Sequence, residues 1–283
     1  MNMEARRTVR LGLIGDNIAR SRSPALHRIA GRLNGLDVSY DLFIPRDLGR
    51  DFDAVFGDCR AAGLRGVNIT YPYKERAAGE VEVEDEEARS IGSVNTVVFD
   101  EGRALGYNTD FTGFVAAYRG MLGETPPGRV AIAGAGGVGK AVAYGLASLG
   151  AEAIAIFDRD RAKAVGLAAA LAKAGIETSV HDHVRHAVRD ADGVVNCTPV
   201  GMVGYPGTPV PRSLLAGRRW AFDAVYTPVD TVFSRDAEAE GLTVISGYEL
   251  FFNQGIHAFE IFTGRAPADL PTLRRKLADD DDA

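Results

Sequence analysis

The stretch that most constrains the fold runs from Val130 to Gly150 and reads VAIAGAGGVGKAVAYGLASLG. An apolar strand pattern is followed by Gly134, Gly136 and Gly139 in G-x-G-x-x-G spacing, and then by a helical pattern. The first glycine permits a tight turn, the second lets backbone approach a pyrophosphate, and the third lets the helix pack closely on the sheet. N–H groups at the start of such a helix favour an anionic ligand. The stretch therefore predicts a Rossmann dinucleotide-binding domain.

A second apolar run, AIAIFD, ends in Asp158, about 20 residues past the last glycine, as the fingerprint requires. A carboxylate at this position accepts hydrogen bonds from the adenosine ribose and repels a 2′-phosphate, which favours NAD. The neighbouring Arg159 is able to bind that phosphate or to stack on adenine. We therefore expect a preference for NAD with some tolerance of NADP. The alternative is a Gly-rich turn followed by an ordinary acidic strand end.

Short apolar runs rich in β-branched residues alternate with longer helical patterns along the chain. This alternation indicates α/β architecture with parallel strands. With 283 residues, 46% of them hydrophobic, the chain is long enough for two domains. The Gly- and Pro-rich stretch at 120–129, GMLGETPPGR, predicts a junction between them. The later stretch YELFFNQGIHAFEIF predicts an amphipathic helix that packs on the core.

Composition and charge disfavour several classes of protein. No apolar run approaches the roughly 20 residues that span a bilayer, and MNMEARRTVR at the start lacks the apolar segment of a signal peptide. The two cysteines, Cys59 and Cys197, fit a reducing compartment. A net charge of −6 with dispersed Lys and Arg disfavours nucleic acid. We therefore expect a cytoplasmic protein with neither membrane nor nucleic-acid partners.

The histidine-rich segment HDHVRH raises the alternative of a metal site at His181, His183 and His186. It lies within the predicted nucleotide domain, where a polar connection from a strand to a helix accounts for it. We therefore expect no metal ion.

Polar residues recur where apolar strands end in the first half of the chain. They are Ser21, Ser23, Asn68, Thr70, Asn95, Thr96, Asn108 and Asp110. In an open parallel sheet, ligands bind outside the carboxyl ends of the strands. Hydroxyl, amide and carboxylate groups gathered there, together with the ammonium group of Lys74, suit a small polyhydroxylated acid.

Two interpretations compete for Lys74 and for Ser23. In GVNITYPYKE, Pro72 fits an early helical position, which would leave Lys74 on the first turn of a surface helix. Ser23 followed by Pro24 is likewise typical of a helix start, with Ser23 as the N-cap. Ser21 has no such structural explanation, which favours a binding role for it.

These segments resemble the shikimate and quinate dehydrogenase family over nearly the whole chain. The matching segments, in the family's order, are SRSPALH, NITYPYKE, SVNTVV, GYNTD, GAGGVGKA, NCTPVGM, DAVYTP and NQGIHAFEIFTG. Members reversibly oxidise one ring hydroxyl of shikimate or quinate with a nicotinamide cofactor. The resemblance implies an N-terminal α/β substrate-binding domain with a mostly parallel sheet, a C-terminal Rossmann domain, and an active site in the cleft between them. We expect the first domain to comprise residues 1–112 and 248–283, and the second 113–247.

Carried over by motif, the resemblance implies a role for each candidate site residue. Lys74 and Asp110 would form the catalytic pair. The substrate-binding set would be Ser21, Ser23, Thr70, Lys74, Asn95, Asp110, Tyr226 and Gln254. The cofactor-binding set would be Gly134, Ala135, Gly136, Gly137, Val138, Asp158, Arg159, Thr198, Pro199, Val200, Met202, Val225 and Gly247. In these sets the two serines and Tyr226 would lie near the substrate carboxylate, and the residues from Thr198 onward would lie near the nicotinamide.

Hydride loss from a secondary alcohol becomes easier as the hydroxyl proton leaves, so the site needs a group that accepts this proton. Lys74 fits by type, although an ordinary lysine pKa of about 10.4 makes it a poor base at neutral pH. Burial would favour its neutral form, whereas an adjacent Asp110 would favour its charged form. Lys74 would act either as a base or as a fixed cation that stabilises an alkoxide-like transition state.

Two segments bear on the branch of the family, and they point in different directions on the substrate. Residues 158–160 read DRD, where NADP-using biosynthetic members commonly carry NRT, and this resembles the NAD-linked quinate/shikimate branch. Residues 21–23 read SRS, as in shikimate-specific members. We expect an enzyme that converts shikimate to 3-dehydroshikimate, with quinate to 3-dehydroquinate as a further reaction. We expect it to be a monomer or homodimer. The alternatives are a dehydrogenase of a related amino ring acid and a non-catalytic NAD-binding sensor.

Overall fold

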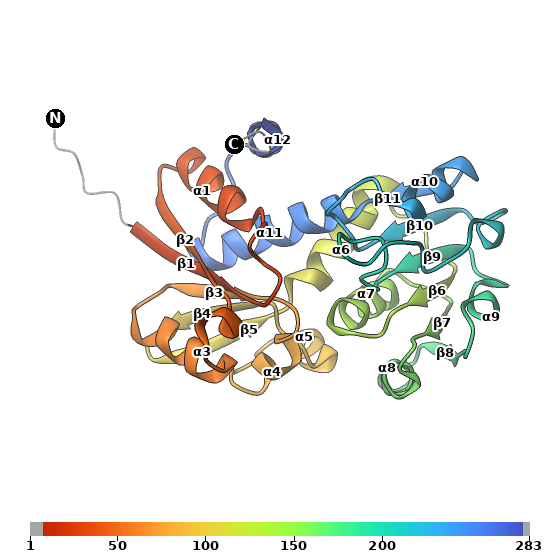
Figure 1. Ribbon diagram of the computed structural model, residues 1–283, viewed down its shortest axis with the longest axis horizontal. Helices are drawn as coiled ribbons and strands as arrows, with labels where there is room; N and C mark the ends of the chain where they lie inside the picture. Colours follow the sequence, from red (N-terminus) through yellow and green to blue (C-terminus); the bar gives the residue numbers. More distant parts are fainter. Residues whose placement is uncertain (1–7, 280–283) are drawn as a thin grey trace. The chain divides into compact units, whose positions relative to one another are not determined.

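The computed structural model describes residues 8–279, which form two compact α/β units (Figure 1). Of these residues, 8–109 and 254–279 belong to the first unit, and 110–253 form the second. No helix within residues 8–279 has an apolar stretch long enough to cross a membrane.

Both divisions between the units fall inside helices, namely α6 (Thr109–Leu122) and α11 (Gly247–Thr263). The predicted boundaries after residues 112 and 247 fall in the same two helices. The Gly- and Pro-rich stretch 120–129 lies within the second unit instead of at a boundary, because α6 carries the chain into that unit before the stretch begins.

The first unit is built on a five-stranded sheet with the order β2-β1-β3-β4-β5. Its elements are β1 (Thr8–Ile14), α1 (Ser23–Leu33), β2 (Asp37–Phe43), α2 (Pro45–Leu48), α3 (Phe52–Ala61), β3 (Gly66–Ile69), α4 (Lys74–Ala78), α5 (Glu86–Ile91), β4 (Thr96–Asp100), β5 (Arg103–Tyr107) and α12 (Leu270–Asp279), with the second part of α11. Strands β1, β2 and β3 are parallel, and β4 runs antiparallel to both of its neighbours.

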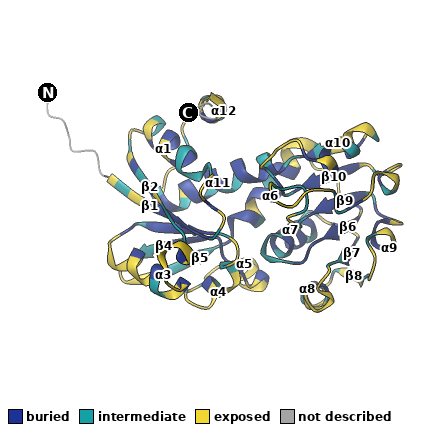
Figure 2. Ribbon diagram, in the orientation of Figure 1, coloured by how far each residue is buried: buried dark blue, intermediate teal, exposed yellow. Residues whose placement is uncertain are grey.

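Alternation along β3 assigns the two faces of this sheet. Val67 and Ile69 are buried in the core that α3 supplies on one face. Gly66 and Asn68 point to the opposite face, because successive strand residues alternate. A Cβ on Gly66 would lie 2.5 Å from the ring of Phe262 in α11, so glycine allows this helix to approach the sheet closely. The strands and α11 are buried, whereas α3 exposes its outer side (Figure 2).

The second unit is built on a six-stranded parallel sheet with the order β11-β10-β9-β6-β7-β8. Its elements after α6 are β6 (Arg129–Ala133), α7 (Gly137–Ser148), β7 (Ala153–Phe157), α8 (Arg161–Lys173), β8 (Glu177–Val180), α9 (Val184–Val188), β9 (Gly193–Asn196), η1 (Arg212–Leu214), β10 (Trp220–Asp223), α10 (Val232–Ala239), β11 (Thr243–Ile245) and the first part of α11. The chain runs from β6 outward to β8 and then returns to β9 on the other side of β6. This reversal is the topological switch point at which such sheets bind dinucleotides.

Side chains of β10 pack on helices of both faces of the second sheet. The ring of Phe222 contacts Phe114 of α6 edge to face, with a centroid distance of 5.0 Å. Ala221 faces the opposite core, which includes Phe233 of α10. Asp223 shares the face of Ala221 because the two residues are two positions apart.

The predicted amphipathic helix is confirmed as α11, and its apolar residues pack in the core. Those residues are Leu250, Phe251, Ile256, Phe259 and Phe262, each at most 8% exposed.

Candidate active site

Backbone bonds join the loops that follow β1 and β3 in the first unit. The N–H of Thr70 donates to the carbonyl of Ile14 at 2.9 Å, and the N–H of Asp16 donates to the carbonyl of Tyr71 at 3.0 Å. The hydroxyl of Tyr73 donates to Asp16 Oδ1 at 2.8 Å. These bonds place the segment with Thr70 beside the segment that leads to the two serines.

The two serines lie together at the start of α1. The Ser21 hydroxyl donates to Ser23 Oγ at 3.2 Å, and Ser21 Oγ accepts from the Ser23 N–H at 3.3 Å. The interpretation of Ser23 as the N-cap is wrong, because Arg22 occupies that position and Ser23 is the first helical residue. Two adjacent hydroxyls at the N-terminus of an 11-residue helix suit a carboxylate ligand.

Lys74 is the first residue of α4, and Tyr73 is its N-cap. The interpretation of Pro72 as an early helical residue is therefore wrong, because Pro72 precedes the cap. The backbone carbonyl of Lys74 accepts a hydrogen bond of 3.0 Å from the N–H of Val94, the residue before Asn95. Lys74 therefore lies on the first turn of α4, half-buried, with its backbone bonded to the residue before Asn95.

Asn95 organises a second polar group in the first unit. Its Oδ1 accepts from the N–H of Thr109 at 2.7 Å and from the Thr109 hydroxyl at 3.1 Å. Thr109 Oγ1 also lies 3.5 Å from Gln254 Oε1, so Asn95 and Gln254 meet at one threonine. Among the described residues, the Nδ2 group of Asn95 has no hydrogen-bond acceptor. That group is therefore able to donate a hydrogen bond to a ligand.

Asp110 follows Thr109 directly and opens the second unit. It is 5% exposed and lies in the first turn of α6, where helix N–H groups favour a negative charge. Lys74 and Asp110 therefore belong to different units.

Asn68 supports Asn95 from the interior. Its Nδ2 donates to the carbonyl of Asn95 at 3.2 Å and to Thr96 Oγ1 at 3.0 Å, and its Oδ1 accepts from the Tyr40 hydroxyl at 2.8 Å.

The ring of His27 stacks on Tyr40 with a centroid distance of 4.9 Å. Burial lowers the pKa of His27 to about 3, because no water solvates the imidazolium. His27 is a packed, neutral side chain.

The glycine turn of the second unit has the shape that a dinucleotide needs. Gly134 has φ of +101°, and a Cβ there would lie 2.7 Å from the backbone of Cys197. A Cβ on Gly139 would lie 2.1 Å from the carbonyl oxygen of Gly134. A Cβ on Gly136, the N-cap of α7, would have nothing within 4 Å, so there is room for a ligand beside this residue. The first N–H groups of α7 lack partners within the helix and point toward this space.

The carboxylate of Asp158 is bound to the same turn. Its Oδ2 accepts from the N–H of Ala135 at 2.7 Å, and its Oδ1 accepts from the N–H of Asp160 at 2.8 Å. Arg159 is exposed and has no hydrogen-bond or ion-pair partner among the described residues. These residues fit NAD, since the fixed negative charge lies at the end of β7, where the adenosine ribose binds in this fold.

The predicted nicotinamide-side residues follow β9 and β10. The N–H and hydroxyl of Thr198 donate to Asn196 Oδ1 at 2.9 and 2.7 Å, and the N–H of Val200 donates to Thr198 Oγ1 at 3.2 Å. A Cβ on Gly247 would lie 2.4 Å from the carbonyl oxygen of Val225, which brings these two residues into contact.

Comparison with known proteins gives matches over both units. The model of the shikimate dehydrogenase substrate binding domain matches residues 13–97, and that of shikimate / quinate 5-dehydrogenase matches residues 120–201. A quinate/shikimate dehydrogenase (NAD(+)) of Corynebacterium efficiens is 39% identical over 94% of this chain and 96% of its own. The chain belongs to the shikimate and quinate dehydrogenase family.

Further relatives in the family use either cofactor. A shikimate dehydrogenase (NADP(+)) of Streptomyces avermitilis is 40% identical over 95% of this chain and 94% of its own. Among solved structures, quinate dehydrogenase of Corynebacterium glutamicum in complex with NAD has a TM-score of 0.88 and 34% identity, covering 96% of this chain and 99% of its own. The predicted family and α/β class are confirmed.

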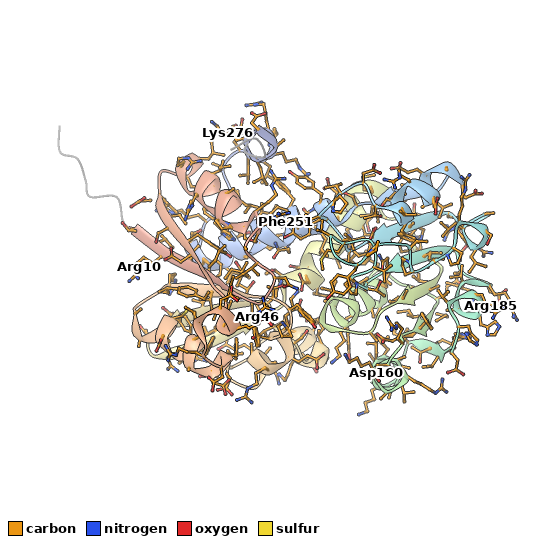
Figure 3. The ribbon with its side chains drawn as sticks, in the orientation of Figure 1. Arg10, Arg46, Asp160, Arg185, Phe251 and Lys276 are labelled. Carbon is orange, nitrogen blue, oxygen red and sulfur yellow. The ribbon has the colours of Figure 1, made fainter. Side chains whose placement is uncertain are left out.

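Tyr226, predicted on the substrate side in this family, lies in the second unit. Its ring stacks on Phe251 with a centroid distance of 4.9 Å and an interplanar angle of 10°. Phe251 is labelled on α11 in Figure 3. The stack fixes the direction of the phenol ring.

Three polar residues that sequence reasoning left without a role take part in these arrangements, namely Thr109, Asn196 and Asp223. Each lies at the end of a strand or at the start of the following helix. Their place at strand ends was the available signal, and it is the signal that identified Asp110. Asn95 and Thr96 were predicted at a strand end as well, but they stand at the start of β4, which runs antiparallel to β3 and therefore begins at the edge where β3 ends.

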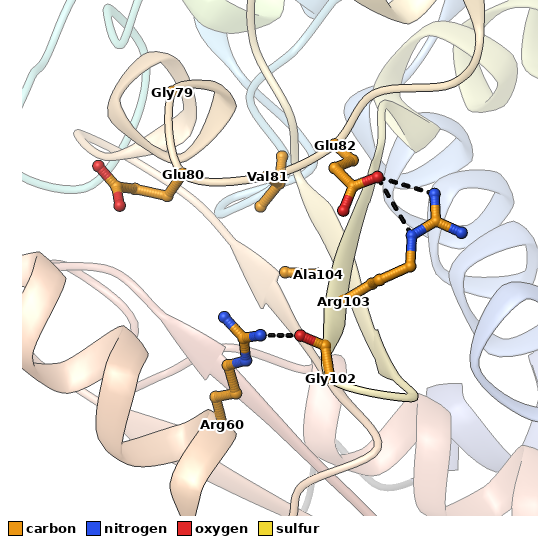
Figure 4. A pocket seen from close by; sticks show the side chains of 8 residues that line it. All are labelled: Arg60, Gly79, Glu80, Val81, Glu82, Gly102, Arg103 and Ala104. Atoms are coloured by element: carbon orange, nitrogen blue, oxygen red, sulfur yellow. Dashed lines mark hydrogen bonds and ion pairs between the residues drawn. The ribbon is translucent and has the colours of Figure 1, made fainter.

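Two other polar features contain no predicted site residue. The HDHVRH segment begins in the connection from β8 to α9, and the His181 ring is 2.9 Å from the Ser179 hydroxyl. A surface hollow of ≈ 290 Å³ beside the β4–β5 hairpin is lined by Arg60, Gly79, Glu80, Val81, Glu82, Gly102, Arg103 and Ala104 (Figure 4). Within the hollow Arg103 is paired with Glu82 and Arg60 donates to the Gly102 carbonyl, while Glu80 is paired with Arg76 outside it, so each charged side chain already has a partner.

Proposed function

We propose that this protein is an NAD-preferring dehydrogenase that converts shikimate to 3-dehydroshikimate and accepts quinate as a further substrate. One observation carries the assignment of the catalytic residues. The backbone carbonyl of Lys74 accepts a hydrogen bond from the N–H of Val94. Asn95, which follows Val94, accepts a hydrogen bond from the N–H of Thr109, and Asp110 follows Thr109. These bonds support the proposal because they tie the residue that opens α4 and the residue before Asp110 to the same short segment, Val94–Asn95.

The substrate-side groups match a ring acid with several hydroxyls. The paired hydroxyls of Ser21 and Ser23 would donate to its carboxylate, and the Tyr226 phenol would lie near the same group. The Asn95 amide, with Thr70 and Gln254, would hold ring hydroxyls. Such a site rejects analogues that lack a hydroxyl, because its own polar groups would then remain unpaired.

Proton transfer is the task of Lys74 and Asp110. NAD, when bound, supplies the hydride acceptor. Lys74 Nζ would take the proton of the reacting hydroxyl, or stabilise the developing alkoxide as a cation, and Asp110 would orient the amine and the hydroxyl.

Asp158 supports the preference for NAD. Its carboxylate is held by two backbone N–H groups, and a 2′-phosphate would bring a second negative charge against it. Two of the relatives agree with this preference, since one is a quinate/shikimate dehydrogenase (NAD(+)) and another was solved with NAD, whereas the Streptomyces avermitilis relative is named for NADP(+). The exposed Arg159 accounts for residual use of NADP.

We also propose that the protein acts on small molecules without nucleic-acid or membrane partners, as a monomer or homodimer in the cytoplasm. The two free thiols, Cys59 and Cys197, support a reducing compartment.

The test of this function is product identification. The purified protein is incubated with NAD and either shikimate, quinate or an amino analogue, and products are identified by mass. We expect loss of two hydrogens from shikimate together with formation of NADH, and the reverse reaction from 3-dehydroshikimate. Conversion of the amino analogue alone would identify an amino ring acid as the substrate in place of shikimate. NAD binding without any conversion would favour a non-catalytic sensor.

A further inference from the structure

Asp223, at the end of β10, is fully buried and accepts four hydrogen bonds within the second unit. Its Oδ1 accepts from Asn196 Nδ2 at 2.9 Å and from the Val225 N–H at 3.0 Å. Its Oδ2 accepts from the hydroxyls of Thr231 at 2.5 Å and Ser234 at 3.3 Å. A buried carboxylate is costly unless donors satisfy it, so these four groups hold one another in place.

Asn196, at the end of β9, connects Asp223 to the following loop by hydrogen bonds. Its Nδ2 also donates to the carbonyl of Val200 at 3.1 Å, and its Oδ1 accepts both donors of Thr198. A flipped amide would set its N–H groups against the Thr198 donors and its oxygen against the Asp223 carboxylate. The carboxylate therefore fixes the orientation of the amide, and the amide fixes the loop of residues 197–200.

This loop borders the space beyond the glycine turn. The backbone of Cys197 lies 2.7 Å from a Cβ built on Gly134, so the loop and the turn are packed together. Strand β7, which carries Asp158 at its end, lies on one side of β6, and strands β9 and β10 lie on the other. A dinucleotide with its adenosine at Asp158 and its pyrophosphate at α7 would extend its other half toward β9 and β10.

We infer that Asp223 and Asn196 are positioning residues for the non-adenosine half of the cofactor. Together they set the geometry of the 197–200 loop and of Val225 against that half. They would make no contact with the adenosine half, which we expect at the glycine turn and Asp158. The inference rests on the proposed function, because it assumes a nicotinamide dinucleotide at this turn.

The test compares dissociation constants for NAD and for ADP, which fills the adenosine half alone. Asp223→Ala and Asn196→Ala should each weaken NAD binding at least about tenfold. The first leaves the Asn196 amide and the Val225 N–H without their shared acceptor, and the second leaves both donors of Thr198 without theirs. The dissociation constant for ADP should stay within about twofold of the wild-type value, because ADP lacks the half that the 197–200 loop would contact. Ser234→Ala is the matched control, since Ser234 donates to the same carboxylate from α10 and has no bond to the loop. NAD binding by this variant should equal that of the wild type.

Equal weakening of NAD and ADP binding would overturn the inference, because it would show general damage to the unit. Unchanged NAD binding would overturn it as well. Asn196→Ala decides the question if Asp223→Ala does not fold, since it leaves three donors on the carboxylate. Failure of the wild-type protein to bind or reduce NAD would contradict the proposed function, whereas a normal wild type with unaffected variants would contradict this inference alone.

Discussion

The side-chain oxygen of Asn95 accepts a hydrogen bond of 2.7 Å from the backbone N–H of Thr109. Asn95 directly precedes β4, and Thr109 is the first residue of α6, with Asp110 next to it. The same carboxamide keeps its Nδ2 group without an acceptor among the described residues. One side chain therefore fixes a helix start with its oxygen and offers a donor to a ligand with its nitrogen.

Two substitutions at Asn95 separate these tasks. Asn95→Asp keeps the acceptor for Thr109 and removes the donor, so KM for shikimate should rise at least about tenfold. Asn95→Ala also removes the bond at the helix start and should lower the free energy of unfolding by about 1 kcal/mol. Steady-state kinetics and denaturant unfolding measure both effects. An unchanged KM in Asn95→Asp would leave Asn95 with the structural role only.

Lys74→Ala should lower kcat at least about a hundredfold, the low end of a general acid–base contribution. Lys173→Ala on the exposed end of α8 is the control and should leave kcat unchanged. Lys74→Arg keeps the positive charge but cannot release a proton at neutral pH. Recovery of kcat in this variant would assign Lys74 the electrostatic role. A nearly unchanged kcat in Lys74→Ala would remove it from the reaction.

Asp158→Asn should shift cofactor preference toward NADP, since it removes the charge and keeps an oxygen for the Ala135 N–H. We expect the ratio of kcat/KM for NAD to that for NADP to fall by about tenfold, which corresponds to one charged contact. Asp160→Asn is the matched control two positions along, where the charge change leaves the cap of α8 intact. An equal shift in the control would mean that general charge, and not the Asp158 contact, sets the preference.

His27 should make the protein less stable as the pH falls. Burial lowers its pKa to about 3 in the folded protein, whereas the unfolded chain takes up the proton below about pH 6.5. The stabilisation is therefore present above pH 6.5 and is lost as the pH falls toward the folded pKa. Between about pH 7 and pH 5 the loss amounts to about 2 kcal/mol. Denaturant unfolding at both pH values measures this loss. From pH 7 to pH 5 the free energy of unfolding should fall by about 2 kcal/mol less in His27→Leu than in the wild type. An equal fall in the two proteins would contradict the lowered pKa of His27.

The cofactor side of the fold was predictable from local spacing. The positions of Gly134, Gly136 and Gly139, followed by Asp158, depend on one turn and two adjacent strands, and they lie within one short stretch of chain. The structure shows close packing at the first and third glycines and open space at the second, as the pattern requires.

The remaining features depend on tertiary packing. The sequence of β5 gives only a weak strand signal because it contains Gly106. Tertiary packing requires this glycine, since a Cβ there would lie 2.5 Å from Val81. Ser23 followed by Pro24 is typical of an N-cap and a first helical residue, yet Arg22 is the N-cap and Ser23 is the first residue of the helix. The bond between Asn196 and Asp223 joins residues 27 positions apart, and only the return of the chain beside β6 brings their strands together.

Oxidation of shikimate with NAD is the reaction on which all of these roles depend. Measurement of kcat/KM for shikimate and for quinate, each with NAD and with NADP, on the purified protein tests it. We expect turnover of shikimate with a clear advantage of NAD over NADP, and measurable turnover of quinate. A clear advantage of NADP, or no turnover in any of the four combinations despite NAD binding, would contradict it.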